Sequence, residues 1–283
     1  MDPRTLFAAD VAWSLWDQEP IEGAFELENS NNQADQSVVL SVSRPWVFGY
    51  EPPSGSGNGR SVLILGGGGY TQLMVGREGI QVARWLANLG FFAFVLVHRF
   101  PNAANGPQAP LDDARKALIL IEEKELSPRG QGVCGLSSGG HLAAALLSEF
   151  PHQWTPSAKN VPNIHFAIIG YGPISTNAAG RTIIPNKAAL EPPEKQELYQ
   201  IVQPDVQLVA PAPPTFIVYS GNDPVVPVVN AYRLSEGITK ARGVVELHVF
   251  ADAPHGFALD TKGLPVSSWP TLCQEWLRQQ ALL

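Results

Sequence analysis

Short apolar runs alternate with helical stretches over most of the chain, and this order limits the possible folds more than any other feature. The runs are rich in β-branched and aromatic side chains, as are strands buried on both faces of a sheet. They lie at residues 61–65, 91–97, 132–136, 165–170, 215–220 and 244–250, and the helical stretches lie at 79–89, 111–124, 140–148, 228–239 and 269–279. The sequence therefore predicts an α/β fold in which helices flank a mostly parallel central sheet of about eight strands.

The remaining strands of that sheet are expected near the N-terminus. Residues 37–43 and 46–50 are β-rich and separated by a short turn, so they predict an antiparallel edge. No repeat or composition break divides the sequence, and we expect residues 1–283 to form a single domain. Residues 175–214 are rich in Pro, Asn, Ala and Glu and are too long for an ordinary connection. They predict a short cap-like excursion over one end of the sheet.

Charge and composition argue against several classes of partner. A formal net charge of −7 without a basic cluster argues against nucleic acid and against an anionic membrane surface. The longest apolar run, residues 89–97, is too short to span a bilayer, and the acidic N-terminal segment lacks the basic start of a secretory signal. We therefore expect a cytoplasmic protein. Cys134 and Cys273 show neither a disulfide framework nor metal-ligand spacing, and no metal or cofactor is expected.

The stretch "GLSSG" at residues 135–139 carries the strongest chemical signal. It lies where an apolar run becomes a helical stretch, and Ser137 occupies the centre of a G-x-S-x-G pattern. This pattern is typical of a nucleophile elbow, a sharp strand-to-helix turn that exposes a serine hydroxyl and needs very small flanking residues. Ser138 follows the nucleophile and is expected to direct its backbone N–H at a developing oxyanion. The alternative is a glycine-rich turn whose serines cap the helix.

Four consecutive glycines at residues 66–69 follow the apolar run 61–65. Without side chains, the backbone N–H groups of such a loop can approach a substrate oxygen, as an oxyanion hole requires. A phosphate-binding loop is the alternative interpretation. However, no Lys-Ser or Lys-Thr pair follows the glycines, and the G-x-G-x-x-G spacing is met only loosely.

An acid and a base follow two later strands of the predicted sheet. Asp223 comes after the run 215–220, and His255 comes after the run 244–250. The carboxyl ends of parallel strands meet at one edge of a sheet, so both residues are expected to lie near Ser137. Each alone could be a turn-capping aspartate or a loop histidine. Together they give the chain order Ser, Asp, His that α/β hydrolases use.

These segments resemble α/β-hydrolase-fold carboxylesterases, close to the acetylxylan- and feruloyl-esterase-like and hormone-sensitive-lipase-like members. The resemblance covers most of the chain and includes "GGGGYTQLMVGREGIQVARWLANLGFFAFVLVHRFP", "GLSSGGHLAAAL", "PPTFIVYSGNDPVVPVVNA" and "APHGFAL". It implies an α/β-hydrolase fold with a small cap or none. It also implies that Ser137 is the nucleophile, His255 the base and Asp223 the residue that orients the base.

The same resemblance implies an oxyanion hole formed by the N–H groups of Gly68, Gly69 and Ser138. We expect a serine esterase that cleaves short acyl groups from a small-molecule ester, with an acetylated sugar of the acetylxylan type as the favoured substrate. Tyr70 and Tyr171 are expected to contact that substrate. A serine peptidase of the same fold and a non-enzymatic binder of small ligands are the alternatives.

Overall fold

One large sheet organises the chain. A computed structural model describes residues 2–16, 20–28, 34–154 and 161–283, and within these ranges eight strands pair in the order β1-β4-β6-β5-β7-β8-β9-β10. The strands are β1 (Val11–Ser14), β4 (Trp46–Tyr50), β5 (Ser61–Leu65), β6 (Phe92–Val97), β7 (Gln131–Leu136), β8 (Ile164–Gly170), β9 (Thr215–Ser220) and β10 (Val245–Phe250). From β6 to β10 all neighbours are parallel, whereas β4 runs antiparallel to β1 and to β6.

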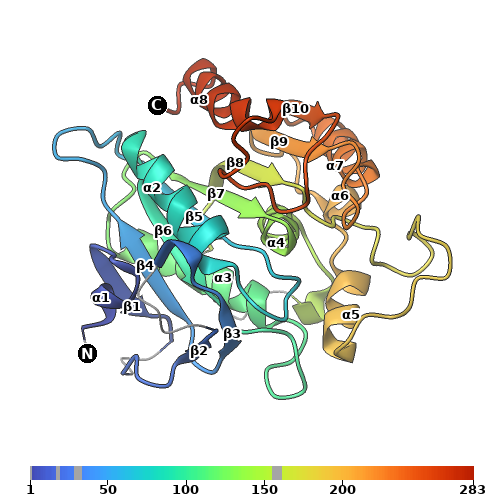
Figure 1. Ribbon diagram of the computed structural model, residues 1–283, viewed down its shortest axis with the longest axis horizontal. Coiled ribbons are helices and arrows are strands. Elements are labelled where there is room, and N and C mark those ends of the chain that lie inside the picture. Colours follow the sequence, from blue (N-terminus) through green and yellow to red (C-terminus); the bar gives the residue numbers. More distant parts are fainter. Residues whose placement is uncertain (1, 17–19, 29–33, 155–160) are drawn as a thin grey trace.

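Helices flank this sheet, and the predicted α/β fold is confirmed (Figure 1). Their bounds are α1 (Pro3–Phe7), α2 (Gln81–Asn88), α3 (Ala109–Glu123), α4 (Ser138–Ala145), α5 (Pro193–Ile201), α6 (Pro204–Gln207), α7 (Val229–Lys240) and α8 (Trp269–Gln279). Every residue of β5, β7 and β9 is buried, which explains why these strands are continuous apolar runs in the sequence. Trp85 of α2 packs edge-on against Trp269 of α8, with the ring centroids 5.2 Å apart.

The N-terminal edge differs from the prediction. Residues 46–50 do form an antiparallel strand of the main sheet, β4. The segment at 37–43 does not lie beside it, because β3 (Val39–Val42) pairs with β2 (Phe25–Leu27) in a separate two-stranded sheet. The edge of the main sheet is instead β1, a four-residue strand that the sequence analysis missed. A strand this short has too few residues to show an alternating pattern.

The segment 175–214 contains α5 and α6. Figure 1 shows α5 and the long loop before it at one side of the molecule, whereas α6 lies against α4 and α7.

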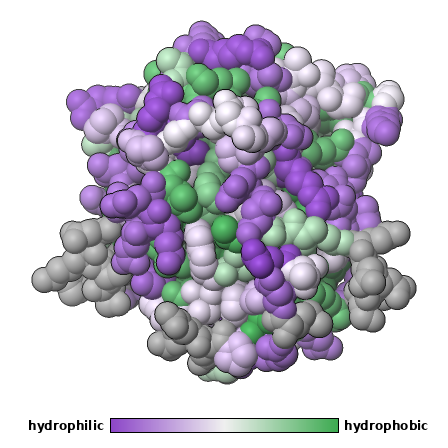
Figure 2. All heavy atoms as spheres, turned by 90° about the vertical axis from the view of Figure 1, so that its left-hand side faces the viewer, coloured by the Kyte–Doolittle hydropathy of each residue, from purple (hydrophilic) through white to green (hydrophobic). Residues whose placement is uncertain are grey.

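The face of the molecule that carries α1 and β1 is mainly polar. Figure 2, which faces the side that carries α1 and β1, shows hydrophilic side chains over most of that face, with small apolar areas between them. Scattered apolar side chains of this kind are normal on a folded protein. Among the described residues, no helix is both long enough and apolar enough to cross a bilayer.

The turn from β7 into α4 depends on a very close backbone approach. A Cβ atom placed on Gly139 would lie 1.9 Å from the carbonyl oxygen of Leu65, at the end of the neighbouring strand β5. A Cβ atom on Gly135 would lie 2.1 Å from the carbonyl oxygen of Gly139. Both clashes are with backbone, which cannot rotate away as a side chain can. The glycines therefore allow α4 to begin directly above the sheet.

This packing predicts that Gly139→Ala destabilises the protein strongly. The added methyl group forces β5 and α4 apart, and overpacking of this kind lowers the free energy of unfolding by about 1–3 kcal/mol. Urea denaturation measures the change. Gly57→Ala is the matched control, because Gly57 is exposed and its Cβ atom would lie 3.4 Å from Pro52 Cγ. The control should change the free energy of unfolding by less than about 0.5 kcal/mol. Equal effects of the two substitutions would contradict the close-approach argument.

Candidate active site

Ser137 lies in a strained turn between β7 and α4. Its backbone angles are φ 53° and ψ −125°, in a region that non-glycine residues rarely occupy. The Ser137 N–H donates to the carbonyl oxygen of Gly170 at 3.0 Å, and the Ser137 carbonyl oxygen accepts from the N–H of Gly140 at 2.8 Å. These bonds hold the strained conformation, which costs of the order of 1–3 kcal/mol. The turn places the Ser137 hydroxyl at the carboxyl end of the sheet.

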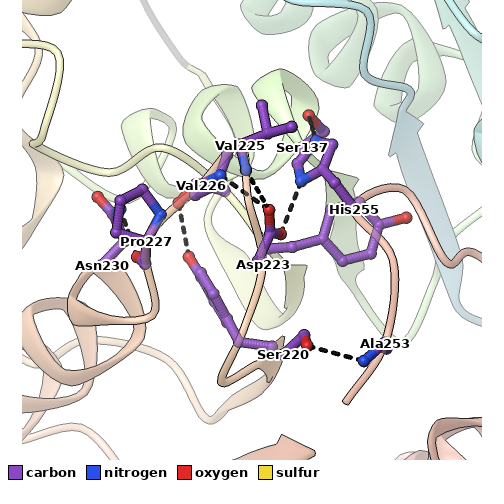
Figure 3. A network of polar contacts seen from close by, with 12 residues as sticks. Ser137, Ser220, Asp223, Val225, Val226, Pro227, Asn230, Ala253 and His255 are labelled. Carbon is purple, nitrogen blue, oxygen red and sulfur yellow. Dashed lines mark hydrogen bonds and ion pairs between the residues drawn. The ribbon is translucent and has the colours of Figure 1, made fainter. Parts of the chain in front are cut away.

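The structure brings Ser137, His255 and Asp223 into one hydrogen-bonded chain. Ser137 Oγ lies 2.9 Å from His255 Nε2, and His255 Nδ1 lies 2.7 Å from Asp223 Oδ2 (Figure 3). The Asp223 side chain is fully buried and that of His255 is 19% exposed. A carboxylate can only accept, so it fixes the proton on Nδ1 and leaves Nε2 free to accept the serine proton.

Two backbone donors orient the carboxylate of Asp223. The N–H groups of Val225 and Val226 donate to Asp223 Oδ1 at 2.8 and 2.9 Å (Figure 3). With Oδ1 held in this way, Oδ2 faces the His255 ring. The local turn after β9 therefore fixes the orientation of the Asp223 carboxylate within the protein itself.

The loops that carry Asp223 and His255 are tied to each other. Ser220 Oγ accepts a hydrogen bond from the N–H of Ala253 at 3.0 Å, and it donates to Asn222 Oδ1 at 2.7 Å (Figure 3). Asn222 Nδ2 in turn donates to Asp252 Oδ1 at 2.7 Å. These side chains follow β9 and β10, which are neighbours in the sheet, so short polar contacts suffice to fix the loop spacing.

The glycine loop lies beside the start of α4. The N–H of Gly69 donates to Ser138 Oγ at 2.9 Å, so this predicted oxyanion donor already has a partner within the protein. The N–H of Gly67 donates to Glu78 Oε2 at 2.7 Å. The other two predicted donors, the N–H groups of Gly68 and Ser138, make no hydrogen bond with the described residues. Both amides are therefore available to a ligand.

Tyr70 and Tyr171, the two residues predicted to contact substrate, both have buried side chains in the structure. Tyr70 is 1% exposed, and its hydroxyl lies 2.9 Å from His141 Nδ1. Tyr171 is fully buried, and its hydroxyl donates to Glu78 Oε1 at 3.0 Å. An aromatic residue that lies close in the sequence to predicted catalytic residues can line the pocket or can pack in the core behind it. Contacts with distant parts of the chain decide between the two positions.

The sequence analysis did not single out Glu78 or His141. His141 Nε2 donates to the carbonyl oxygen of Val202 at 2.9 Å, so Nδ1 carries no proton and accepts from the Tyr70 hydroxyl. Burial lowers the pKa of His141 to about 4, which keeps the ring neutral. These contacts connect the glycine loop, α4 and the end of α5. In the sequence, the position of His141 one turn into α4 was the available signal.

The structure also bears on metal binding. Within the described ranges, no group of three or more His, Cys, Asp and Glu side chains is arranged to hold a metal ion. Cys134 and Cys273 are both buried, and burial raises the pKa of each thiol. A buried thiol with a raised pKa is a poor nucleophile and a poor ligand.

Comparisons with known proteins show which family and fold this chain resembles. A sequence model of the BD-FAE family matches residues 50–238. The acetylxylan esterase of Xylanibacter ruminicola is 26% identical in an alignment of 214 residues that covers 72% of this chain and 42% of that protein. The chain thus spans less than half the length of this relative.

Solved structures show the same architecture. An acetyl ester-xyloside bifunctional hydrolase from Caldicellulosiruptor lactoaceticus superposes with a TM-score of 0.69 at 24% identity, covering 97% of this chain and 98% of that one. The carboxylesterase Cest-2923 from Lactobacillus plantarum gives a TM-score of 0.68 at 19% identity, covering 92% and 98%. The fold is therefore the α/β-hydrolase fold.

The contacts of His141 predict an acid-dependent loss of stability. The unfolded chain binds a proton at this ring near pH ~6.5, whereas the folded protein resists protonation until about pH 4. Because the folded-state pKa is lowered, the stabilisation is present above the unfolded pKa and is lost as the pH falls. The loss amounts to about 3 kcal/mol between these limits.

His141→Gln tests this expectation. The variant should have a lower free energy of unfolding than the wild type at pH 7.5. The difference between the two proteins should be smaller by about 3 kcal/mol at pH 4. Urea denaturation at several pH values measures both quantities. If the difference in free energy of unfolding between the two proteins is the same at pH 7.5 and pH 4, the buried His141 ring does not resist protonation.

Proposed function

This chain belongs to the BD-FAE family, and we propose that it is a serine esterase that removes short acyl groups, chiefly acetyl, from carbohydrate hydroxyls. The observation that carries the proposal is the chain of two hydrogen bonds from Ser137 Oγ through His255 to a buried Asp223. Serine hydrolases use this arrangement to make a weak nucleophile reactive. The family and fold support the ester as the bond cleaved.

Acylation begins at the Ser137 hydroxyl. His255 Nε2 takes the serine proton while Ser137 Oγ attacks the ester carbonyl carbon. Asp223 stabilises the imidazolium that forms and keeps the ring in the required orientation. When the tetrahedral intermediate collapses, His255 gives its proton to the departing alcohol oxygen, and the acyl group stays on Ser137.

Deacylation repeats these steps with water. His255 Nε2 takes a proton from a water molecule, and the water oxygen attacks the acyl carbon on Ser137. The second tetrahedral intermediate breaks to release the carboxylic acid and returns the proton to Ser137 Oγ. No residue other than those of the triad needs to move a proton.

The oxyanion of each intermediate is held by two backbone donors, the N–H groups of Gly68 and Ser138. Both are without a partner among the described residues, as donors for a transient charge must be. Gly69 has a different role from the one predicted. Its N–H donates to Ser138 Oγ and so holds the glycine loop against the first residue of α4.

The substrate assignment rests on relatives and on the segment 175–214. Proteins similar to this chain are an acetylxylan esterase and an acetyl ester-xyloside hydrolase. We take the segment as a short cap of a single domain. Its Lys195 reaches the glycine loop, since a Cβ atom on Gly69 would lie 3.8 Å from Lys195 Nζ. A small cavity of about 210 Å³ within the segment is lined by alanine and leucine side chains together with polar ones, among them Asn177, Lys187 and Gln196. These amide and amino groups can hydrogen-bond to the hydroxyls of a polar alcohol such as a sugar.

The test is acetate release from acetylated xylo-oligosaccharides, measured beside hydrolysis of p-nitrophenyl acetate and butyrate. The wild-type protein should deacetylate the sugar and prefer acetate to butyrate. Ser137→Ala should reduce turnover to the uncatalysed background. Asp223→Asn should lower kcat by about 10⁴-fold, because the amide holds His255 in the wrong tautomer.

Other outcomes would redirect the assignment. Hydrolysis of the nitrophenyl esters alone would keep the serine esterase and remove the sugar. Cleavage of peptide p-nitroanilides in place of esters would indicate a peptidase. If no ester is turned over and a fluorophosphonate probe does not label Ser137, the protein is a binder of small ligands.

A further inference from the structure

A buried carboxylate lies between the glycine loop and the loop that carries His255. Glu78 belongs to the π-helix Val75–Ile80 (η2), which leads into α2, and the residue is 4% exposed. Turns of π-helix are rare and occur frequently at functional sites. In the sequence Glu78 resembles an ordinary polar residue at the start of a surface helix, yet here its side chain points into the protein.

One oxygen of Glu78 holds the glycine loop. Glu78 Oε2 accepts the N–H of Gly67 at 2.7 Å, and a Cβ atom on Gly67 would lie 2.4 Å from that oxygen. On its other side the same Cβ atom would lie 2.5 Å from Ser137 Cβ. The backbone of Gly67 is therefore enclosed between the carboxylate and the nucleophile. The next N–H in the chain belongs to Gly68, one of the two oxyanion donors.

The other oxygen of Glu78 holds the His255 loop. Glu78 Oε1 accepts the hydroxyl proton of Tyr171 at 3.0 Å, and the Tyr171 oxygen accepts the N–H of Ala258 at 3.2 Å. The Tyr171 ring packs edge-on against the His255 ring, with centroids 5.3 Å apart and an interplanar angle of 75°. A Cβ atom on Gly256 would lie 3.6 Å from Glu78 Oε1. The carboxylate thus supports the residues that follow the base.

We propose that Glu78 is a positioning residue that fixes the oxyanion donor Gly68 and the base His255 relative to Ser137 through one carboxylate. This inference rests on the proposed esterase function. The hydrogen bonds of Glu78 go to neither Ser137 nor His255 but to Gly67 and to Tyr171, and it acts through these two residues. Donors that are aligned before the reaction stabilise the transition state more than the bound substrate, so the role is expressed in kcat.

The electrostatics separate this role from a purely structural one. Burial raises the pKa of Glu78, opposed by the hydrogen bonds from Gly67 and Tyr171 and by the nearby His255 and Arg77. A carboxyl whose pKa is raised on folding loses stabilisation as the pH rises through its folded pKa. Above that pH the ionised Glu78 lowers the stability of the fold. A neutral residue of the same shape removes this penalty.

Glu78→Gln is the decisive variant. Glutamine keeps the shape of the side chain, but its single oxygen cannot accept both the Gly67 N–H and the Tyr171 hydroxyl. With p-nitrophenyl acetate we expect kcat to fall by about 10- to 100-fold and KM to stay within about threefold. Phenylboronic acid forms a tetrahedral adduct on the serine, so its inhibition constant should rise by about the same factor. The thermal midpoint should stay well above the assay temperature, so that the fall in kcat does not come from loss of folded protein.

Two further variants are compared with Glu78→Gln. Tyr171→Phe removes one of the two hydrogen bonds, so it should lower kcat by a smaller factor and add little in the Glu78→Gln background. Asp113→Asn is the matched control, because Asp113 is also a buried carboxylate and pairs with Arg99 at 2.7 Å outside the site. The control should lower the thermal midpoint and leave kcat within about twofold.

Three outcomes would overturn the inference. The first is a kcat of Glu78→Gln within about threefold of the wild type, and the second is a lower kcat with an unchanged boronate inhibition constant. The third is a large fall of the thermal midpoint in parallel with activity. A wild-type protein that hydrolyses no ester would overturn the proposed function itself, and that result is read before any variant is made.

Discussion

The contact between backbone atoms at the start of α4 governs the rest of the structure. No side chain fits between Gly139 and the carbonyl oxygen of Leu65, so β5, β7 and α4 approach as closely as three backbones can. Because of this approach, Ser137 turns sharply into the left-handed region of φ and directs its hydroxyl beyond the carboxyl end of the sheet. The glycine loop that follows β5 is brought beside the same point. Ser137 and the N–H groups proposed as oxyanion donors are therefore neighbours as a result of strand packing, before any polar contact is considered.

The acid and the base reach this point by a different route. They lie 86 or more residues along the chain from Ser137, on loops after β9 and β10, so the register of the sheet alone brings them near. Polar contacts then fix the final positions of Asp223 and of the two loops. These contacts include those of Ser220 and of the N–H groups of Val225 and Val226. Sheet packing provides proximity and loop hydrogen bonds provide orientation, and catalysis by a serine triad needs both.

The sequence was sufficient for those parts of the fold that depend on local pattern. The predicted strand 215–220 and helix 269–279 have the observed bounds of β9 and α8, since a continuous apolar run and an amphipathic period are local signals. The elbow at Ser137 could be predicted because its glycines are contiguous with it. Pairing of β3 with β2, burial of Tyr171 and the inward direction of Glu78 could not, because each depends on which distant segments pack together.

The hydrogen bond from Gly69 to Ser138 shows how such packing changes the chemistry available to the site. A serine after the nucleophile adds a hydroxyl that accepts from the glycine loop, so the two segments that supply the oxyanion donors are joined directly. One of three predicted donors is used for this purpose, and the remaining two are held at a fixed separation. Donors fixed in advance need no reorganisation when charge develops, which is where an enzyme gains over water. Glu78 holds the opposite side of the same loop, so the glycine loop is anchored at Gly67 and at Gly69 with the donor Gly68 between them.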